Sequence, residues 1–194
     1  MLPHRTFLDV RTASRFFCAF LVVLLGVSAT AVATTKDSVQ IDAVKAAFVF
    51  NFAKFTMWPE HRLQDAEAAI VFCLHREDLD HRAAKDLERQ KIDKRSVTVR
   101  ILETESDIRG CHLLFLSLSL SRAETGTLVE QSKQENVLLI SDMPGFAERG
   151  GHIALVTEKN RFRFKINLES TIDCGLKLSS KLLQLADIVT TSEP

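Results

Sequence analysis

The chain has 194 residues, 46% of them hydrophobic, and its 25 basic side chains are balanced by 25 acidic ones. Nucleic-acid-binding proteins need a basic surface that displaces counterions from phosphates, so this charge balance argues against a nucleic-acid partner. Residues 34–194 are long enough to form one domain with its own hydrophobic core.

The first 33 residues have the features of a secretory signal peptide. Arg5, Arg11 and Arg15 precede an apolar stretch from Phe16 to Val27, and small residues lead up to Ala31-Val32-Ala33. The apolar stretch is too short to span a membrane comfortably, and the small residues suit signal peptidase. We expect cleavage after Ala33 and a periplasmic protein consisting of residues 34–194.

A helix rich in phenylalanine is predicted within residues 43–60, and we expect it to end near Trp58 because Pro59 cannot continue the hydrogen-bond ladder. At about 100° per residue it has two apolar faces. One holds Ile41, Val44, Phe48, Phe52 and Phe55, and the other holds Ala43, Ala46, Phe50, Ala53 and Met57. Two apolar faces favour burial of the helix on both sides. One side would contact the protein's own sheet, and the other would contact a second protein, which in one interpretation is another copy of this chain.

Three polar residues interrupt this helix, Lys45, Asn51 and Lys54, and two interpretations apply to Asn51 and Lys54. Either they reach neighbouring loops or they mark a polar patch within a protein interface. The candidate residues for an interface or core on this helix are Phe48, Phe50, Asn51, Phe52, Lys54, Phe55 and Trp58.

Strands and helices then alternate along the chain. Apolar runs predict strands at 68–74, 97–102, 113–116 and 137–140, and helices are predicted at 78–90 and 121–131. Ser121 is placed to cap the second of these helices, with Glu124 at the capping-box position. The alternation predicts an α/β fold with a mainly parallel sheet flanked by helices.

The pattern changes after residue 141. A glycine-rich loop at 142–151 leads into predicted strands at 152–157 and 161–166, which form an antiparallel hairpin at the edge of the sheet. Arg161, Arg163 and Lys165 alternate with apolar residues, so they form either a solvated face or a cationic surface for an acidic partner. A last helix is predicted from Ser179-Ser180 through Val189.

The glycine-rich loop has three interpretations. Its backbone amides could hold an anion, although it lacks the Lys-Ser/Thr ending of a phosphate-binding loop. Its glycines could simply permit a tight return into the hairpin. In the third interpretation Phe146, Glu148 and Arg149 are exposed contacts on a rigid loop and bind a partner.

Three cysteines follow the predicted cleavage point, Cys73, Cys111 and Cys174. In an oxidising compartment we expect one disulfide and one spare cysteine. Cys73 closes one predicted strand and Cys111 opens another, so adjacent strand ends could bring them within bonding distance. Cys174 fits a small buried residue better than a nucleophile. The histidines match no compact metal motif, and we expect no metal site.

Five segments in series resemble the YfiR family of periplasmic proteins: AVKAAFVFNFAKFTMWPE (43–60), FCLHRED (72–78), CHLLFLS (111–117), ISDMPGFAERGGHIALV (140–156) and RFRFKINLESTIDCGLKLSSKLLQLA (161–186). The resemblance covers nearly all of residues 34–194. It implies a small α/β domain without catalytic activity or a cofactor. It also implies a disulfide between Cys73 and Cys111, whereas the second disulfide that some members have near the glycine loop is missing here.

The resemblance further implies a function. Members of the family repress an inner-membrane diguanylate cyclase, a GGDEF protein, by binding its periplasmic region, which lowers cyclic-di-GMP and so affects biofilm formation. An outer-membrane lipoprotein relieves the repression by capturing the repressor. For this chain we expect Phe146, Glu148, Arg149, Arg161, Arg163 and Lys165 to bind the partner.

Two other functions compete with this one. A periplasmic small-molecule sensor would hold a ligand at the carboxyl ends of the strands and signal to a histidine kinase or an outer-membrane transporter. A hydrolase would need an activated nucleophile, and the sequence contains no nucleophile-elbow pattern. We therefore predict that the protein is a regulator and not an enzyme.

Overall fold

The computed structural model describes residues 31–65, 67–75, 78–104, 107–117, 120–159 and 161–192, with side chains from residue 38 onward. The chain divides into two units, residues 1–40 and residues 41–194. Of the first unit only residues 31–40 are described, and they begin helix α2 (Ala31–Lys54). The predicted leader otherwise lies outside the described residues. Within the described part of the chain, no helix is long and apolar enough to cross a membrane.

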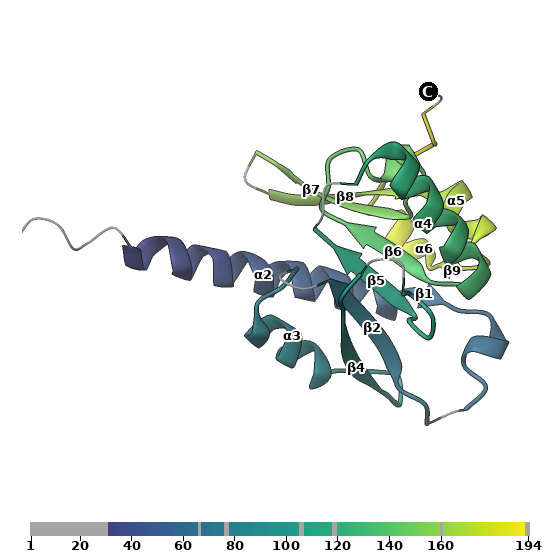
Figure 1. Cartoon of the computed structure of the whole chain (residues 1–194), viewed down its shortest axis with the longest axis horizontal. Helices are drawn as coiled ribbons and strands as arrows, with labels where there is room; N and C mark the ends of the chain where they lie inside the picture. Colours follow the sequence, from purple (N-terminus) through teal and green to yellow (C-terminus); the bar gives the residue numbers. More distant parts are fainter. Residues whose placement is uncertain are drawn as a thin grey trace, which may run out of the picture. The chain divides into compact units, whose positions relative to one another are not determined.

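Residues 41–194 fold around an eight-stranded sheet with the strand order β10-β8-β7-β6-β5-β2-β4-β3 (Figure 1). The strands are β2 (Ile70–His75), β3 (Lys91–Ile92), β4 (Arg95–Leu102), β5 (Leu113–Leu116), β6 (Leu138–Ser141), β7 (Ile153–Glu158), β8 (Arg161–Asn167) and β10 (Asp187–Val189). From β4 to β7 all neighbours are parallel, whereas β8 is antiparallel to β7. The predicted α/β fold, mainly parallel with an antiparallel hairpin, is confirmed.

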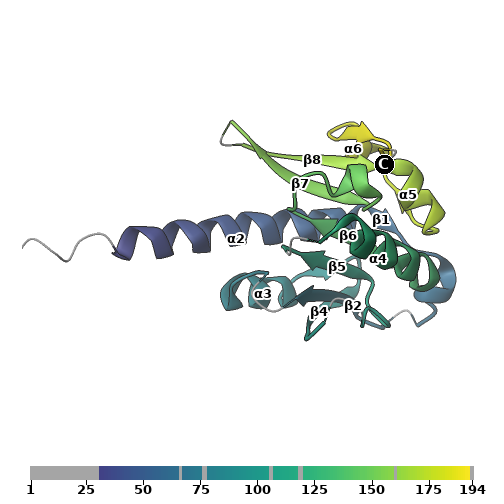
Figure 2. The ribbon, with the colours of Figure 1, turned by 45° about the horizontal axis from the view of Figure 1, so that its top comes forward.

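Side chains of the central strands alternate between two hydrophobic cores, one on each face of the sheet. Phe72 and Phe115 belong to the core that includes α2 and α3 (His81–Glu88). Cys73 and Leu114 belong to the other core, which includes α4 (Arg122–Glu135) and the short turn η2 (Ala147–Arg149). Figure 2 shows α3 and α4 apart from each other on different sides of the strands. Helix α5 (Leu168–Asp173) and the turn η1 (Glu60–Arg62) complete the main elements.

The capping box predicted from sequence is present at the start of α4. The Ser121 hydroxyl accepts from the backbone N–H of Glu124 at 3.2 Å, and the Glu124 carboxylate accepts from the backbone N–H of Ser121 at 2.7 Å. Each side chain satisfies an amide that the helix itself leaves without a partner.

Helix α2 ends at Lys54, before the predicted end near Trp58. Thr56 and Met57 form a short strand, β1 (Thr56–Met57), which pairs with β9 (Lys177–Leu178). The Thr56 hydroxyl also donates to the carbonyl oxygen of Phe52 at 2.7 Å. The chain therefore leaves the helix earlier because a segment more than a hundred residues away offers it strand pairing.

The prediction of a long last helix is wrong. Helix α6 is a single turn (Ser180–Leu183), and Val189 lies in strand β10. Because β10 pairs in parallel with β8, the antiparallel hairpin is also not at the edge of the sheet. Strand pairing with β8 is more favourable here than the helix that the spacing of the leucines predicts. As a result, the Leu185 side chain is 76% exposed.

Candidate functional site

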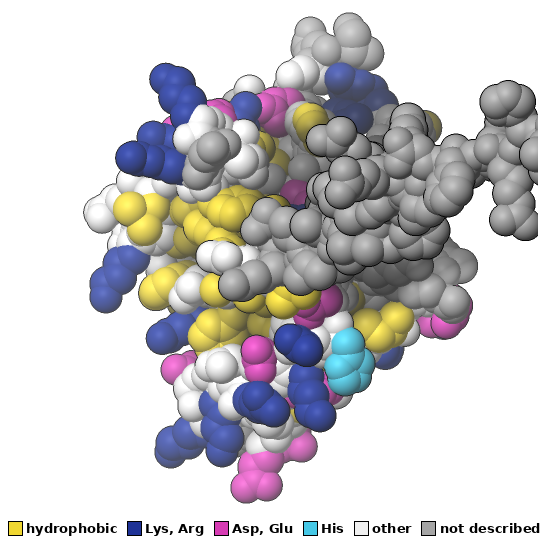
Figure 3. Space-filling view, turned by 90° about the vertical axis from the view of Figure 1, so that its left-hand side faces the viewer, with side chains coloured by type: hydrophobic (Ala, Val, Ile, Leu, Met, Phe, Trp, Pro, Cys, Tyr) yellow, Lys and Arg dark blue, Asp and Glu magenta, His cyan; other side chains and the backbone are white. Residues whose placement is uncertain are grey.

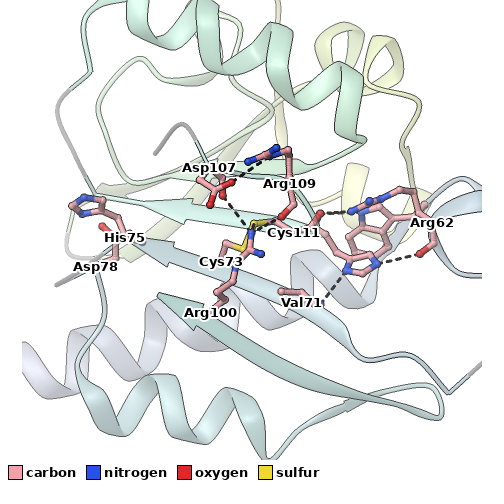
Figure 4. The surroundings of a disulfide bond; sticks show 11 residues. Arg62, Val71, Cys73, His75, Asp78, Arg100, Asp107, Arg109 and Cys111 are labelled. Atoms are coloured by element: carbon pink, nitrogen blue, oxygen red, sulfur yellow. Dashed lines mark hydrogen bonds and ion pairs between the residues drawn. A yellow bond between two sulfur atoms is a disulfide. The ribbon is translucent and has the colours of Figure 1, made fainter. Parts of the chain in front are cut away.

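A buried carboxylate joins two strands at the carboxyl edge of the parallel sheet. Asp78 accepts from the backbone N–H of His75 at 2.5 Å and from that of Ser117 at 2.8 Å, at the ends of β2 and β5. Along the chain, strands are added to the sheet first on the β4 side of β2 and then on its β5 side. Ligand sites in such sheets usually lie where this order reverses, which here is between β2 and β5. Burial raises the pKa of Asp78 to about 6, although both amides favour the ionised form. Figure 4 shows His75 and Asp78 at one end of these strands and Arg62 at the other.

Helix α2 is fastened to this edge by charged side chains. The Lys45 ammonium lies 2.7 Å from the carboxylate of Asp142, which follows β6. The Asp42 carboxylate accepts from the backbone N–H of Asp80, just before α3, at 3.1 Å. Among the residues that the structure describes, no group of three or more His, Cys, Asp or Glu is placed to hold a metal ion.

A groove of about 240 Å³ lies between α2 and α3, and we call it the α2–α3 groove. It is lined by Ala43, Ala46, Ala47, Phe50, Asn51, Ala83, Asp86, Leu87 and Gln90. The sensor hypothesis placed a pocket at the carboxyl ends of the strands, whereas this groove runs between two helices. Its alanines were visible in the sequence, but only the packing of α3 against α2 turns them into a concave surface.

The aromatic residues of α2 and of the segment that follows it, up to Trp58, divide into two groups. Phe52 and Trp58 are buried, while Phe48, Phe50 and Phe55 are partly exposed. Phe48 lies 5.8 Å, ring to ring, from Phe162 of β8, so the hairpin packs against this face of the helix. The Met57 side chain is 55% exposed, contrary to the expectation of burial on both faces.

Asn51 and Lys54 of α2 make no hydrogen bond or ion pair with a loop among the described residues. The Asn51 amide group donates to the carbonyl oxygen of Ala47, one turn earlier in the same helix, at 2.8 Å. Both Asn51 and Lys54 are exposed. Their role in a protein interface stays a prediction.

The structure corrects one of the predicted contacts on the glycine-rich loop. Phe146 is fully buried under the loop and cannot be an exposed contact. Its neighbours Glu148 and Arg149 are partly exposed, and the Arg149 guanidinium donates to the carbonyl oxygen of Pro144 at 2.7 Å. The loop is held on its other side by Ser192, whose backbone N–H donates to the carbonyl oxygen of Glu148 at 2.8 Å.

The structure brings the predicted loop and hairpin residues onto one surface. Lys165 of β8 lies 2.8 Å from the Glu148 carboxylate. Burial raises the pKa of Glu148, but this hydrogen bond and the nearby cations outweigh it and leave the pKa below its usual value. Arg161 and Arg163 are exposed on the same side of β8 as Lys165, two residues apart. We call Glu148, Arg149, Arg161, Arg163 and Lys165 the loop–hairpin surface.

Sequence analysis missed two exposed aliphatic side chains that follow α6. Leu185 is 76% exposed and Ile188 is 51% exposed. Ile188 pairs in register with the buried Ile166 of β8, so its side chain lies on the face of the sheet opposite Lys165, which pairs with Asp187. The helix predicted for this segment placed Leu185 in the core, so its exposure was not predicted.

The predicted disulfide between Cys73 and Cys111 is present, with 5.8 Å between the two Cα atoms, and both residues are fully buried. It links β2 to Cys111, two residues before the neighbouring strand β5. The Arg100 guanidinium lies beside it, 2.9 Å from the Cys111 sulfur and 2.6 Å from the carbonyl oxygen of Arg109 (Figure 4). Arg100 thus fastens the loop before β5 to strand β4.

Cys174 is a free, fully buried cysteine, in agreement with its prediction as a small core residue. Its thiol donates to the carbonyl oxygen of Ser132 at 3.1 Å. Burial raises the pKa of this thiol to about 11, so the nucleophilic thiolate is not populated at neutral pH.

Two histidines extend the strand ladders of the sheet. The Nδ1 atom of His112 accepts from the backbone N–H of Val71 at 3.0 Å, and that of His152 accepts from the backbone N–H of Leu139 at 3.0 Å. Burial lowers the pKa of His112, and lowers that of His152, which is fully buried, to about 3. Both are neutral structural groups at neutral pH.

His152 should make the protein less stable in acid. The unfolded chain protonates this histidine near pH 6.5 but the folded protein does so only near pH 3, so stability is lost as the pH falls through this window. Asp78 acts in the opposite direction below about pH 6, because the folded protein takes up its proton first. Between pH 7 and pH 5, the free energy of unfolding of wild type should fall by about 2 kcal/mol more than that of His152→Asn. Asparagine is chosen because its side chain keeps an acceptor for the backbone N–H of Leu139.

Urea unfolding of both proteins at the two pH values measures this difference. Asp78 and all other groups are common to the two proteins and cancel. Parallel pH dependences would show that His152 is not the group that the folded protein keeps neutral.

No curated protein sequence matches the chain significantly. Two solved structures are distantly similar. One is an ABC domain in complex with L-Trp from Streptococcus pneumonia, with 10% identity, a TM-score of 0.42, and coverage of 63% of this chain and 55% of the other. The second is a ligand-free, open substrate-binding protein with adhesive properties from Clostridium difficile, with 10% identity, a TM-score of 0.45, and coverage of 65% and 55%. The chain thus spans about half the length of each.

Residues 42–187 match the YfiR/HmsC-like family, and this range contains the sheet from β2 to β8, the disulfide and the loop–hairpin surface. The chain therefore belongs to the YfiR/HmsC-like family, a regulatory family of periplasmic proteins linked to diguanylate cyclase signalling.

Proposed function

We propose that this protein binds the periplasmic region of an inner-membrane diguanylate cyclase and represses it, which lowers cyclic-di-GMP. The observation that carries the proposal is the family match over residues 42–187. The mechanism is a population shift. If the protein binds the inactive conformation of the cyclase more tightly than the active one, it shifts the cyclase toward the inactive state without chemistry of its own.

We infer that the loop–hairpin surface contacts the cyclase. Three of its four cations are on β8, and Lys165 is joined to the loop through Glu148. Exposed cations on a strand of the sheet suit a partner with an acidic surface. An outer-membrane lipoprotein that captures the protein would relieve the repression.

Deletion of the gene tests the proposal, and cyclic-di-GMP should rise. Wild-type protein supplied in trans should restore the low level, whereas Arg161→Glu/Arg163→Glu should not, because reversed charges repel an acidic partner. Arg82→Glu/Lys85→Glu is a matched control with two exposed cations on α3 and should restore it. Unchanged cyclic-di-GMP on deletion, together with no membrane protein recovered with the tagged wild type, would contradict the proposal.

A further inference from the structure

We propose that the α2–α3 groove is a binding site for a small primary amine that carries an apolar group, such as an arylalkylamine. The inference rests on the residues that line the groove and is independent of the proposed repression of a cyclase.

The walls of the groove are apolar because four alanines leave space between two larger side chains. Ala46, Ala83 and Leu87 are 5%, 3% and 2% exposed, so the floor is fixed by core packing. Phe50 closes one side as a partly exposed aromatic ring. The volume of about 240 Å³ is slightly below the range of sites that hold drug-sized ligands. The groove therefore suits a ligand the size of one aromatic ring with a short chain.

The polar lining is concentrated at one end. The backbone N–H of Asp80 donates to Asp42, which joins the start of α3 to α2, and the two helices run side by side in the same direction (Figures 1 and 2). The far end of the groove is therefore the one that carries Asn51 and Gln90, with Asp86 one turn before Gln90. A ligand that fills the groove has its apolar group near Ala43 and Ala83.

The polar end offers acceptors and negative charge. Asn51 uses one N–H of its amide group in the hydrogen bond to Ala47, and its carbonyl oxygen is available to accept from a ligand. Asp86 contributes a carboxylate, and the described residues that line the groove include no Lys or Arg. Arg89 pairs with Asp86, but their side chains are 68% and 65% exposed, so this ion pair is weak and can be replaced.

An alkylammonium group complements this end of the groove. It has three N–H donors and is charged at neutral pH. A carboxylate or phosphate would be repelled by Asp86, and Arg89, the cation that pairs with Asp86, is not among the residues that line the groove. Figure 3 shows hydrophobic side chains gathered in the middle of one face of the molecule, with charged side chains above and below. These charges are of both signs, so the negative charge that would hold an ammonium group comes from Asp86, which lines the groove.

The test is an NMR titration of the isotope-labelled protein with 2-phenylethylamine and, separately, with 2-phenylethanol. We expect the amine to shift the backbone amide signals of Ala47, Ala83 and Gln90, and to bind about three to ten times more tightly than the alcohol. In Asp86→Asn the amine should lose this advantage. Equal affinity of the two compounds for wild type, or shifts scattered over the protein, would overturn the proposal.

A substitution that fills the groove provides the second arm. Ala47 is exposed, so Ala47→Trp should fold normally while its indole occupies the groove and abolishes binding. Ala123→Trp makes the same change at an exposed alanine of α4 and should leave binding unchanged. Undiminished binding to Ala47→Trp would place the amine elsewhere and refute the site.

Discussion

Replacement of Gly151 by alanine should lower the free energy of unfolding by about 3 kcal/mol, at the upper end of the cost of overpacking a protein core. A Cβ atom on Gly151 would lie 2.3 Å from Cε1 of Phe146 and 2.4 Å from its Cδ1. The Phe146 ring is fully buried and cannot swing into solvent, so the loop or the core around it has to move. Urea or thermal unfolding measures the loss.

Gly126→Ala is the matched control for this prediction. Gly126 lies within α4, and a Cβ atom there meets nothing within 4 Å. Because glycine is a poor helix former, this variant should be more stable than wild type by about 0.5–1 kcal/mol. If the clash with Phe146 causes the loss of stability, Phe146→Leu should lower the free energy of unfolding by less in the Gly151→Ala protein than in wild type. A Gly151→Ala protein as stable as wild type would show that the Phe146 ring has room to move.

Removal of the disulfide is the second change with a large expected effect. The bond closes a loop with a sequence separation of 38 residues, and in the chain-entropy model such a loop stabilises a protein by about 3–4 kcal/mol. The Cys73→Ala/Cys111→Ala protein should therefore unfold at a clearly lower urea concentration than oxidised wild type. Each substitution also leaves a small space in the core, which adds to the loss.

Reduction separates the effect of the bond from that of the substitutions. Dithiothreitol should destabilise wild type and leave the double-alanine protein unchanged, since its remaining described cysteine, Cys174, is already a free thiol. Cys174 should react with thiol reagents only after unfolding, because it is fully buried and burial raises its pKa to about 11. Equal stability of reduced and oxidised wild type would mean that the unfolded chain gains no freedom when the bond is broken.

Local sequence patterns determined much of this fold. The apolar run at 113–116 became β5, with its bounds unchanged. Ser121 and Glu124 form the predicted capping box, and the alternation of Phe164 and Ile166 with basic residues gave the strand β8 and its two faces. These features depend on neighbours within a few residues, so the sequence alone contains the physical information needed to predict them.

Tertiary structure decided the features that depend on distant partners. Helix α2 ends early because Thr56 pairs with Leu178, and the last predicted helix is replaced by β10 because Ile188 pairs with Ile166. Phe146 is buried because its loop folds over its ring, and the α2–α3 groove exists because α3 packs beside the alanines of α2. Strand pairing and burial are set by which segments meet in space. Periodicity within one segment shows which residues favour burial, but it does not show which other segment will cover them.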